Sequence, residues 1–213
     1  MKLRNPFSGL SHLAGVLLSA IGIVFLLVAA HGRTRQIVSF AIYGAALIFL
    51  YSASALYHLL RLPPRKEARL FGLDRAAIYA LIAGTYTPLC LVVLPPAWGW
   101  SLLGVVWGFA TIGIVVDAVS CQRAPDWLQA VLYLATGWVA IAAVVPLFHA
   151  LSAAALAWLL AGCLIYSAGA VICVTDRPLL WPRVFGAHDL WHVLVLVGSA
   201  CHFVVMLRFV APM

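Results

Sequence analysis

Seven long apolar runs account for most of this chain of 213 residues and leave it few folds to choose from. They lie near residues 12–30, 37–60, 72–94, 98–119, 127–148, 151–174 and 184–210. A membrane-spanning helix needs about 20 apolar residues, whereas a strand of a membrane barrel alternates polar and apolar residues over about 10. Because the runs are continuous, the sequence predicts an all-α membrane protein, a seven-helix bundle that residues 1–213 form as a single domain.

The composition excludes several other classes of protein. Hydrophobic residues make up 65% of the chain and charged residues 9%, against roughly 25% charged residues in a soluble domain. A soluble globular domain, a disordered chain and a nucleic-acid reader are therefore ruled out. The first run superficially resembles a signal peptide, but it extends to about Ala30 and is long enough to span, so we expect it to be retained.

The basic residues predict the orientation of the bundle. One side would hold the N-terminus and the loops near 61–71, 120–126 and 175–183, and the other the remaining loops and the C-terminus. Nine basic residues fall on the first side and three on the second: Lys2, Arg4, Arg61, Arg65, Lys66, Arg69, Arg123, Arg177 and Arg183 against Arg33, Arg35 and Arg208. Since cytoplasmic loops carry the excess of Lys and Arg, we expect the N-terminus inside and the C-terminus outside the cell's inner (plasma) membrane.

The cysteines give no sign of a framework. There are five of them, an odd number, and no two form a CxxC pair: Cys90, Cys121, Cys163, Cys173 and Cys201. We interpret them as small buried hydrophobes and expect neither a disulfide network nor a thiolate zinc site.

Ionisable residues within the runs are informative because they are costly in a bilayer. His58 lies near the end of the second run, Asp74 begins the third, and His188 and His192 begin the seventh. With the N-terminus inside, all four lie at one level near the cytoplasmic face. The sequence therefore predicts that three helices bring these side chains together.

The spacing of the histidines favours a metal site. His188 and His192 are four residues apart, which places them on one helix face about 6 Å from each other. Two such imidazoles can bind one zinc ion, and His58 would supply a third ligand and leave one position open for water. Asp74 would hold that water or act as general base. Ser54, one turn before His58, would donate to a substrate oxygen or a bound water.

The other histidines are given weaker roles. His12 begins the first run at the same level; it could be a fourth ligand, although a helix-end role is favoured. His202 lies about 15 Å beyond His192 along the same helix, so it cannot share the metal, and we expect it to be buried and hydrogen-bonded. His31 and His149 fall on the opposite side of the membrane.

Two acidic residues have no firm assignment. Asp117 has no obvious partner, and Arg75 and Arg123 are the candidates. Asp189 is rotated by about 100° from His188 and would face another helix or the headgroups.

These residues occur in an order by which the chain resembles the hemolysin III family, within the progestin and adiponectin receptor group, whose wider relatives include the alkaline ceramidases. The similarity extends from about Asn5 to Phe209. The matching stretches are Ser54-x3-His58, Asp74-Arg75-Ala76-Ala77-Ile78-Tyr79, Ala83-Gly84-Thr85-Tyr86-Thr87-Pro88, His188-Asp189-Leu190-Trp191-His192, Gly198-Ser199 and His202-Phe203.

The resemblance implies a seven-helix bundle with a cytoplasmic N-terminus. It implies zinc held by His58, His188 and His192, with Asp74 holding a zinc-bound water. It also suggests hydrolysis of a lipid amide or ester bond, as in the ceramidase-like relatives. The long cytoplasmic N-terminal segment of the receptor members has no counterpart here, so a hormone-receptor role is not expected.

Two functions stay open on these residues. The first is an intramembrane zinc hydrolase whose lipid substrate or ligand enters from the bilayer. The alternative is a non-enzymatic membrane protein, namely a hemolysin-like pore, a transporter or a sensor, in which a structural zinc site braces the second, third and seventh helices. The sequence does not decide the substrate or the oligomeric state.

Overall fold

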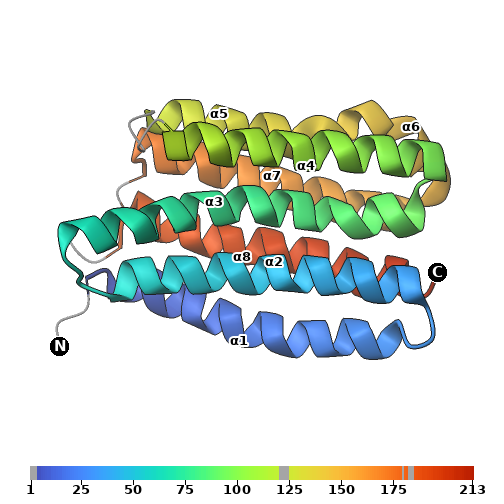
Figure 1. The fold of residues 1–213 in the computed structure, drawn as a ribbon, viewed down its shortest axis with the longest axis horizontal. Coiled ribbons are helices and arrows are strands. Elements are labelled where there is room, and N and C mark those ends of the chain that lie inside the picture. Colours follow the sequence, from blue (N-terminus) through green and yellow to red (C-terminus); the bar gives the residue numbers. More distant parts are fainter. Residues whose placement is uncertain (1–3, 120–124, 179, 182–184) are drawn as a thin grey trace.

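The computed structural model describes residues 4–119, 125–178, 180–181 and 185–213, which are nearly all helical (Figure 1). Four residues used in the sequence argument, Lys2, Cys121, Arg123 and Arg183, lie outside these ranges. Seven segments are long and apolar enough to cross a membrane: Pro6–Ala29, Thr34–Leu59, Pro64–Val93, Pro96–Val119, Asp126–Ala150, Ala153–Thr175 and Ala187–Val210. The predicted seven-helix membrane bundle is thereby confirmed.

Four of the seven spans are single helices, and three contain a change of helical type. The single helices are α1 (Pro6–Ala29), α2 (Thr34–Leu59), α4 (Pro96–Val119) and α7 (Ala153–Thr175). The third span joins α3 (Pro64–Pro88) to a π-helical turn, η1 (Leu89–Val93), and the seventh joins α8 (Ala187–Val205) to η3 (Met206–Val210). The fifth consists of α5 (Asp126–Gly137), a 3-10 segment η2 (Trp138–Ala143) and α6 (Val144–Ala150).

Two helices begin earlier than their apolar runs predict. α1 begins at Pro6 and α3 at Pro64, and both prolines lie in the first turn, where a missing N–H breaks no helical bond. The first turn of α3 also carries Arg65, Lys66 and Glu67, which interrupt the apolar pattern without interrupting the helix. Asp74 consequently lies inside α3, about three turns from its beginning, and not at the opening of the span.

At Pro88 the helix of the third span changes to the π-helical turn η1. Proline has no N–H to donate to the carbonyl of Gly84, one turn earlier. The hydroxyls of Thr85 and Thr87 donate to the carbonyls of Leu81 and Ala83, at 2.8 and 2.9 Å, and not to that of Gly84.

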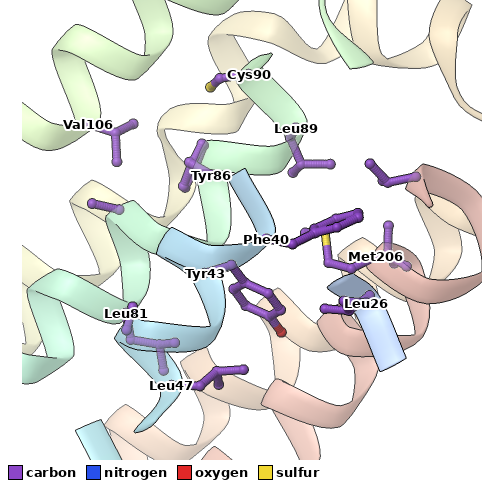
Figure 2. Close-up of a cluster of buried hydrophobic side chains, with 14 of the residues drawn as sticks. Leu26, Phe40, Tyr43, Leu47, Leu81, Tyr86, Leu89, Cys90, Val106 and Met206 are labelled. Atoms are coloured by element: carbon purple, nitrogen blue, oxygen red, sulfur yellow. The ribbon is translucent and has the colours of Figure 1, made fainter. Parts of the chain in front are cut away.

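The centre of the bundle is formed by α2 and α3. In these two spans 56% and 61% of the most apolar stretch is buried, against 17% in the fifth span. Figure 2 shows the core around Phe40 and Tyr43 of α2, with Leu26 from α1 and Met206 from η3 packed against them. Helices α1 and α3 both pack against α2, and α4 packs against α3. Helix α8 contacts α1 and α7.

The outer surface of the bundle is itself apolar. Leu18, Val28, Trp100 and Phe148 are each about two-thirds exposed, and many other large hydrophobic side chains face outward. An exposed apolar surface of this extent is typical of helices that lie against lipid. The termini lie at opposite ends of the bundle (Figure 1), as seven spans require. The cytoplasmic assignment of the N-terminus stays a prediction.

A close approach of α2 and α3 depends on Gly84. A Cβ atom at this position would lie 2.6 Å from the Cβ of Ala46, so a side chain would push the two helices apart. The same two helices carry His58 and Asp74.

Candidate metal centre

Two helix ends deliver the three predicted histidine ligands. His58 is in the last turn of α2, and His188 and His192 occupy the first two turns of α8. The beginning of α8 is fixed by Asp189, whose carboxylate accepts a hydrogen bond from the backbone N–H of Gly186 at 3.1 Å. A carboxylate in the first turn is also favoured by the helix dipole. The rotation of α8, and with it the direction of both histidines, is set at this point.

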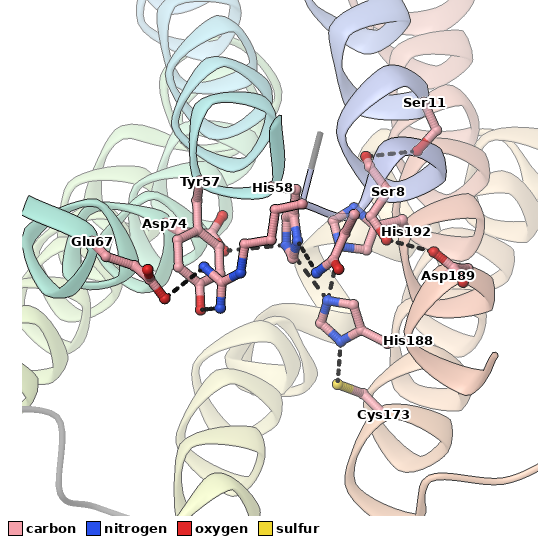
Figure 3. Close-up of polar contacts among 12 residues, drawn as sticks. Ser8, Ser11, Tyr57, His58, Glu67, Asp74, Cys173, His188, Asp189 and His192 are labelled. Atoms are coloured by element: carbon pink, nitrogen blue, oxygen red, sulfur yellow. Dashed lines mark hydrogen bonds and ion pairs between the residues drawn. The ribbon is translucent and has the colours of Figure 1, made fainter. Parts of the chain in front are cut away.

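The three imidazoles converge through the same ring atom. The Nε2 of His188 lies 3.1 Å from the Nε2 of His192 and 3.5 Å from the Nε2 of His58 (Figure 3). The ligand atoms of all three lie within 4.8 Å of one another. These residues therefore form a group that could hold a metal ion, as the spacing of His188 and His192 predicted.

The separations suit a tetrahedral ion. Zinc–nitrogen bonds of about 2.05 Å in tetrahedral geometry place the ligand nitrogens about 3.3 Å apart. The separations of the His188 Nε2 from the Nε2 atoms of His192 and His58, 3.1 and 3.5 Å, bracket that value. Three neutral imidazoles with their Nε2 lone pairs turned inward repel one another unless a cation lies between them, so the donor set fits a metal.

Burial differs among the three histidines. His58 and His192 are buried, with 2% of each residue exposed, whereas His188 is exposed. The group is thus walled by the bundle on one side and open at His188 on the other. An ion or a small reactant can reach it from that side.

Asp74 and Ser54 flank this group on the α2–α3 side. The Asp74 carboxylate oxygen lies 4.0 Å from the Nε2 of His58, and Figure 3 shows the two side chains facing each other. The buried Ser54 hydroxyl is a hydrogen-bond partner of the same carboxylate. The structure therefore brings all five predicted site residues to one end of the bundle; their roles in binding and catalysis stay predictions.

The structure also places beside the site three residues that sequence reasoning did not include or undervalued. The side chain of Asn5 contacts the Nδ1 of His58 at 3.2 Å, and the sulfur of Cys173 lies 3.9 Å from the Nδ1 of His188. His12 is two turns inside α1 and buried, so the favoured helix-end role is wrong. Its ring centroid lies 4.0 Å from that of His192.

A second polar cluster lies on α3, α4 and α5. Arg75 pairs with Asp117 at 2.9 Å, which confirms the first of the two expected partners; the other, Arg123, is outside the described residues. Gln129 donates to Asp117 at 3.0 Å and accepts from the Tyr79 hydroxyl at 3.1 Å. These contacts tie the Asp74-bearing helix to its two neighbours.

His202 is separate from both clusters. It is buried as expected, and its ring stacks on that of Tyr166 with centroids 5.5 Å apart. The Nδ1 atom makes no hydrogen bond to any residue that the structure describes, so the predicted hydrogen bond is not found at this atom.

The fold and the histidines together define a class, a multi-pass membrane protein with a three-histidine group at one end of a seven-helix bundle. The chain belongs to the haemolysin-III related family, whose sequence model matches residues 2–203. The family inferred from the short motifs is thereby confirmed.

Individual relatives agree with this membership. The chain is 36% identical over 210 residues to hemolysin-3 of Bacillus cereus, covering 96% of this chain and 91% of the relative. It is 38% identical over 204 residues to a hemolysin-3 homolog of Bacillus subtilis (strain 168), covering 95% and 92%. It is 32% identical over 197 residues to the heptahelical transmembrane protein ADIPOR2 of Oryza sativa subsp. japonica, covering 82% of each chain. The last match supports the link to the progestin and adiponectin receptor group.

Proposed function

We propose that the protein is a single-domain, zinc-dependent hydrolase that cleaves a lipid amide or ester bond at the cytoplasmic leaflet of the cell's inner (plasma) membrane. The observation that carries the proposal is the convergence of three Nε2 atoms, at 3.1 and 3.5 Å, with a carboxylate 4.0 Å from one of them. Three protein ligands with one open position are the pattern of catalytic zinc sites; structural sites are closed by a fourth ligand.

The histidines and the carboxylate have separate tasks in this proposal. His58, His188 and His192 would hold the ion through Nε2. When bound, zinc supplies a Lewis acid that polarises a carbonyl and lowers the pKa of water to about 7. Asp74 would accept the proton of the attacking water and later return it to the leaving group. The Ser54 hydroxyl, by donating to Asp74, would hold the carboxylate in position.

A surface hollow beside the group could hold part of a lipid, while the open side of the group itself is at His188. A surface hollow of about 350 Å³ opens between α2 and α3, and the ring of Tyr57 in its wall lies 4.8 Å from the ring of His58. Its lining is Tyr57, Pro64, Glu67, Ala68 and Phe71. A lipid headgroup region with one carbonyl could rest there, while its chain stays against the apolar outer surface.

The first test is metal content. Detergent-purified protein is expected to contain about one zinc ion per chain by elemental analysis. His188→Ala and His192→Ala should each lose most of it, because two imidazoles hold the ion poorly. His149→Ala is the matched control, since His149 ends α6 on the opposite side of the bundle. Unchanged zinc in both ligand variants would contradict the assignment.

The second test is turnover. Zinc-loaded protein in liposomes is expected to release fatty acid from a ceramide, an acyl-amide or a phospholipid, and His58→Ala should not. If no class of lipid is cleaved faster than by that variant, the enzymatic proposal fails.

A second candidate is favoured by the names of the two Bacillus relatives, hemolysin-3 and its homolog, which denote lysis of blood cells. In this case the protein would permeabilise membranes, and the metal would brace α2 against α8. Leakage of a trapped dye from liposomes without release of fatty acid would favour this candidate over the hydrolase.

A further inference from the structure

Each imidazole of the metal centre has a second ring nitrogen that points away from the converging Nε2 atoms. A metal-bound neutral histidine carries a proton on that second nitrogen, and the residue that accepts it fixes the tautomer and the ring orientation. The groups around the three Nδ1 atoms therefore determine how strongly the orientation of each imidazole is fixed.

One face of α1 reaches two of the three histidines. Asn5, Ser8 and His12 are spaced by three and four residues, so they line one side of the first turns of α1. Asn5 contacts the Nδ1 of His58 at 3.2 Å, and its backbone N–H donates to the carbonyl of the same histidine at 2.9 Å. Rotating the amide group of Asn5 by 180° exchanges its oxygen and its NH2 group at this position. When the oxygen faces His58, it would accept a hydrogen bond from the proton on Nδ1.

Ser8 continues this face toward α8. Its hydroxyl donates to the carboxylate of Asp189 at 2.6 Å, and the same carboxylate fixes the beginning of α8 (Figure 3). The α1 face thus holds the backbone of α2 through Asn5 and the first turn of α8 through Ser8, the two elements that carry the histidines.

His12 completes the face beside His192. Both residues are buried, and their ring centroids are 4.0 Å apart. Neither ring nitrogen of His12, nor the Nδ1 of His192, makes a hydrogen bond of normal geometry to a residue that the structure describes. Rings this close are packed against each other, so the His12 ring restricts the rotation of the His192 ring.

The third histidine, His188, is contacted by a residue of α7. The sulfur of Cys173 lies 3.9 Å from the Nδ1 of His188, on the side of the ring away from the other two histidines (Figure 3). A thiol sulfur is a weak acceptor, but His188 is the exposed member of the group and has the most freedom to turn. Cys173 is only half-buried, unlike Cys90 and Cys201.

We propose that Asn5, His12 and Cys173 are the positioning residues of the metal centre, one for each imidazole. Asn5 and Cys173 hold the Nδ1 atoms of His58 and His188, and His12 packs against the ring of His192, so that every Nε2 faces the ion. The inference rests on the proposed metal centre. It assigns to α1 and α7 a task in metal binding although neither helix supplies a ligand.

The experiment measures zinc affinity by competition with a chelator, using the full-length protein in detergent. Asn5→Leu and Cys173→Ala remove the acceptor, and His12→Ala removes the ring that packs on His192. Loss of such partners typically weakens metal binding about 10–100-fold, and that is the expected result for each variant. Asn5→Asp and Cys173→Ser restore an acceptor and should recover most of the affinity.

Matched controls separate positioning from packing. Cys163→Ala removes a thiol from the same helix, ten residues from Cys173, and Leu13→Ala removes an outward-facing neighbour of His12. Both should bind zinc as the unaltered protein does. The visible spectrum of cobalt-substituted protein gives a second readout, because a turned imidazole changes the ligand field without any loss of fold.

The outcomes distinguish the two proposals. If the unaltered protein binds zinc, His188→Ala loses it, and the three positioning variants bind as tightly as the controls, then the inference is overturned while the metal centre stands. If a variant folds poorly, only its folded fraction is compared: tight binding by Cys173→Ser and weak binding by folded Cys173→Ala support positioning, and equal binding by both contradicts it. A protein that binds no zinc at all overturns both proposals.

Discussion

Asp74 differs from the three histidines in what its position permits. Its oxygen is 4.0 Å from the Nε2 of His58, and Ser54 donates to the carboxylate. The group of ligand atoms that lie within 4.8 Å of one another consists of the three histidines and does not include Asp74, which stands just outside it. A carboxylate at that distance can exchange a proton with a group held at the open position.

This placement predicts a separation of binding from turnover. Asp74→Asn keeps the shape and removes the base, so zinc content should stay close to that of the unaltered protein. Lipid cleavage should fall about 10²–10⁴-fold, the usual contribution of a general acid–base group. Zinc analysis and a cleavage assay on the same preparation check it. Loss of zinc equal to that in His188→Ala would instead make Asp74 a ligand.

Ser54→Ala is expected to have a milder effect. The hydroxyl orients Asp74 but takes no proton, and a water molecule can replace it in part. The cleavage rate, measured beside that of Asp74→Asn, should lie between those of that variant and the unaltered protein. A loss as great as that of Asp74→Asn would assign Ser54 a direct part in the reaction.

For the individual residues, the sequence could predict that the three histidines and Asp74 lie together, but not what surrounds them. His188 and His192 share a face by helical period alone, and His58 and Asp74 followed from a common depth in the membrane. Asn5 and Cys173 touch His58 and His188 from other elements of the chain, across 53 and 15 residues, and the helical period within one run does not predict such contacts. The spacing of Asn5, Ser8 and His12 was the one signal in the sequence that could have revealed the α1 face.

Among the elements, the fifth span shows how a broken helix is repaired. Pro146 cannot donate to the carbonyl one turn earlier, and the preceding residues form the 3-10 segment η2. The hydroxyl of Tyr86 donates to the carbonyl of Gly137 at 2.5 Å and accepts from the N–H of Ala140 at 2.8 Å. One side chain of α3 thus satisfies both a carbonyl and an N–H of the backbone at the break.

Tyr86→Phe should therefore destabilise the bundle without touching the metal centre. The change leaves one carbonyl and one N–H unpaired, at about 1–3 kcal/mol for each buried group. Thermal unfolding in detergent measures the loss. Tyr133→Phe is the control, because its hydroxyl makes a single bond of 3.2 Å to the carbonyl of Arg75. Equal unfolding temperatures for the two variants would contradict the role of the Tyr86 hydroxyl in satisfying the backbone of the fifth span.

Helix boundaries follow less directly from the sequence than the number of helices. Apolar runs reveal the part of a helix that lies in lipid, so the charged first turn of α3 was missed, and Asp74 was placed at the wrong point of its helix. The changes of helical type at η1, η2 and η3 depend on which neighbouring helix satisfies the freed backbone groups. The sequence of one apolar run does not indicate which helices lie next to it.

For the whole molecule, seven spans place the termini on opposite sides of the membrane. Nine basic residues lie on the side of the N-terminus and three on the other side, which predicts that the N-terminus is cytoplasmic. A reporter that is active only in the cytoplasm should work when fused to the N-terminus and fail at the C-terminus. Activity at the C-terminus alone would invert the bundle and move the histidines to the outer leaflet.

The histidine group joins the last span of the chain to the second, and 130 residues separate His188 from His58. Ribosomes add about 5–20 residues per second, so His58 waits about 7–26 s for its partners to be made. Any fragment released before α8 contains one of the three imidazoles and cannot retain the ion. If the proposed metal centre binds zinc, a chain can retain the ion only after α8 has been made, so bound zinc would report that synthesis of the molecule is complete.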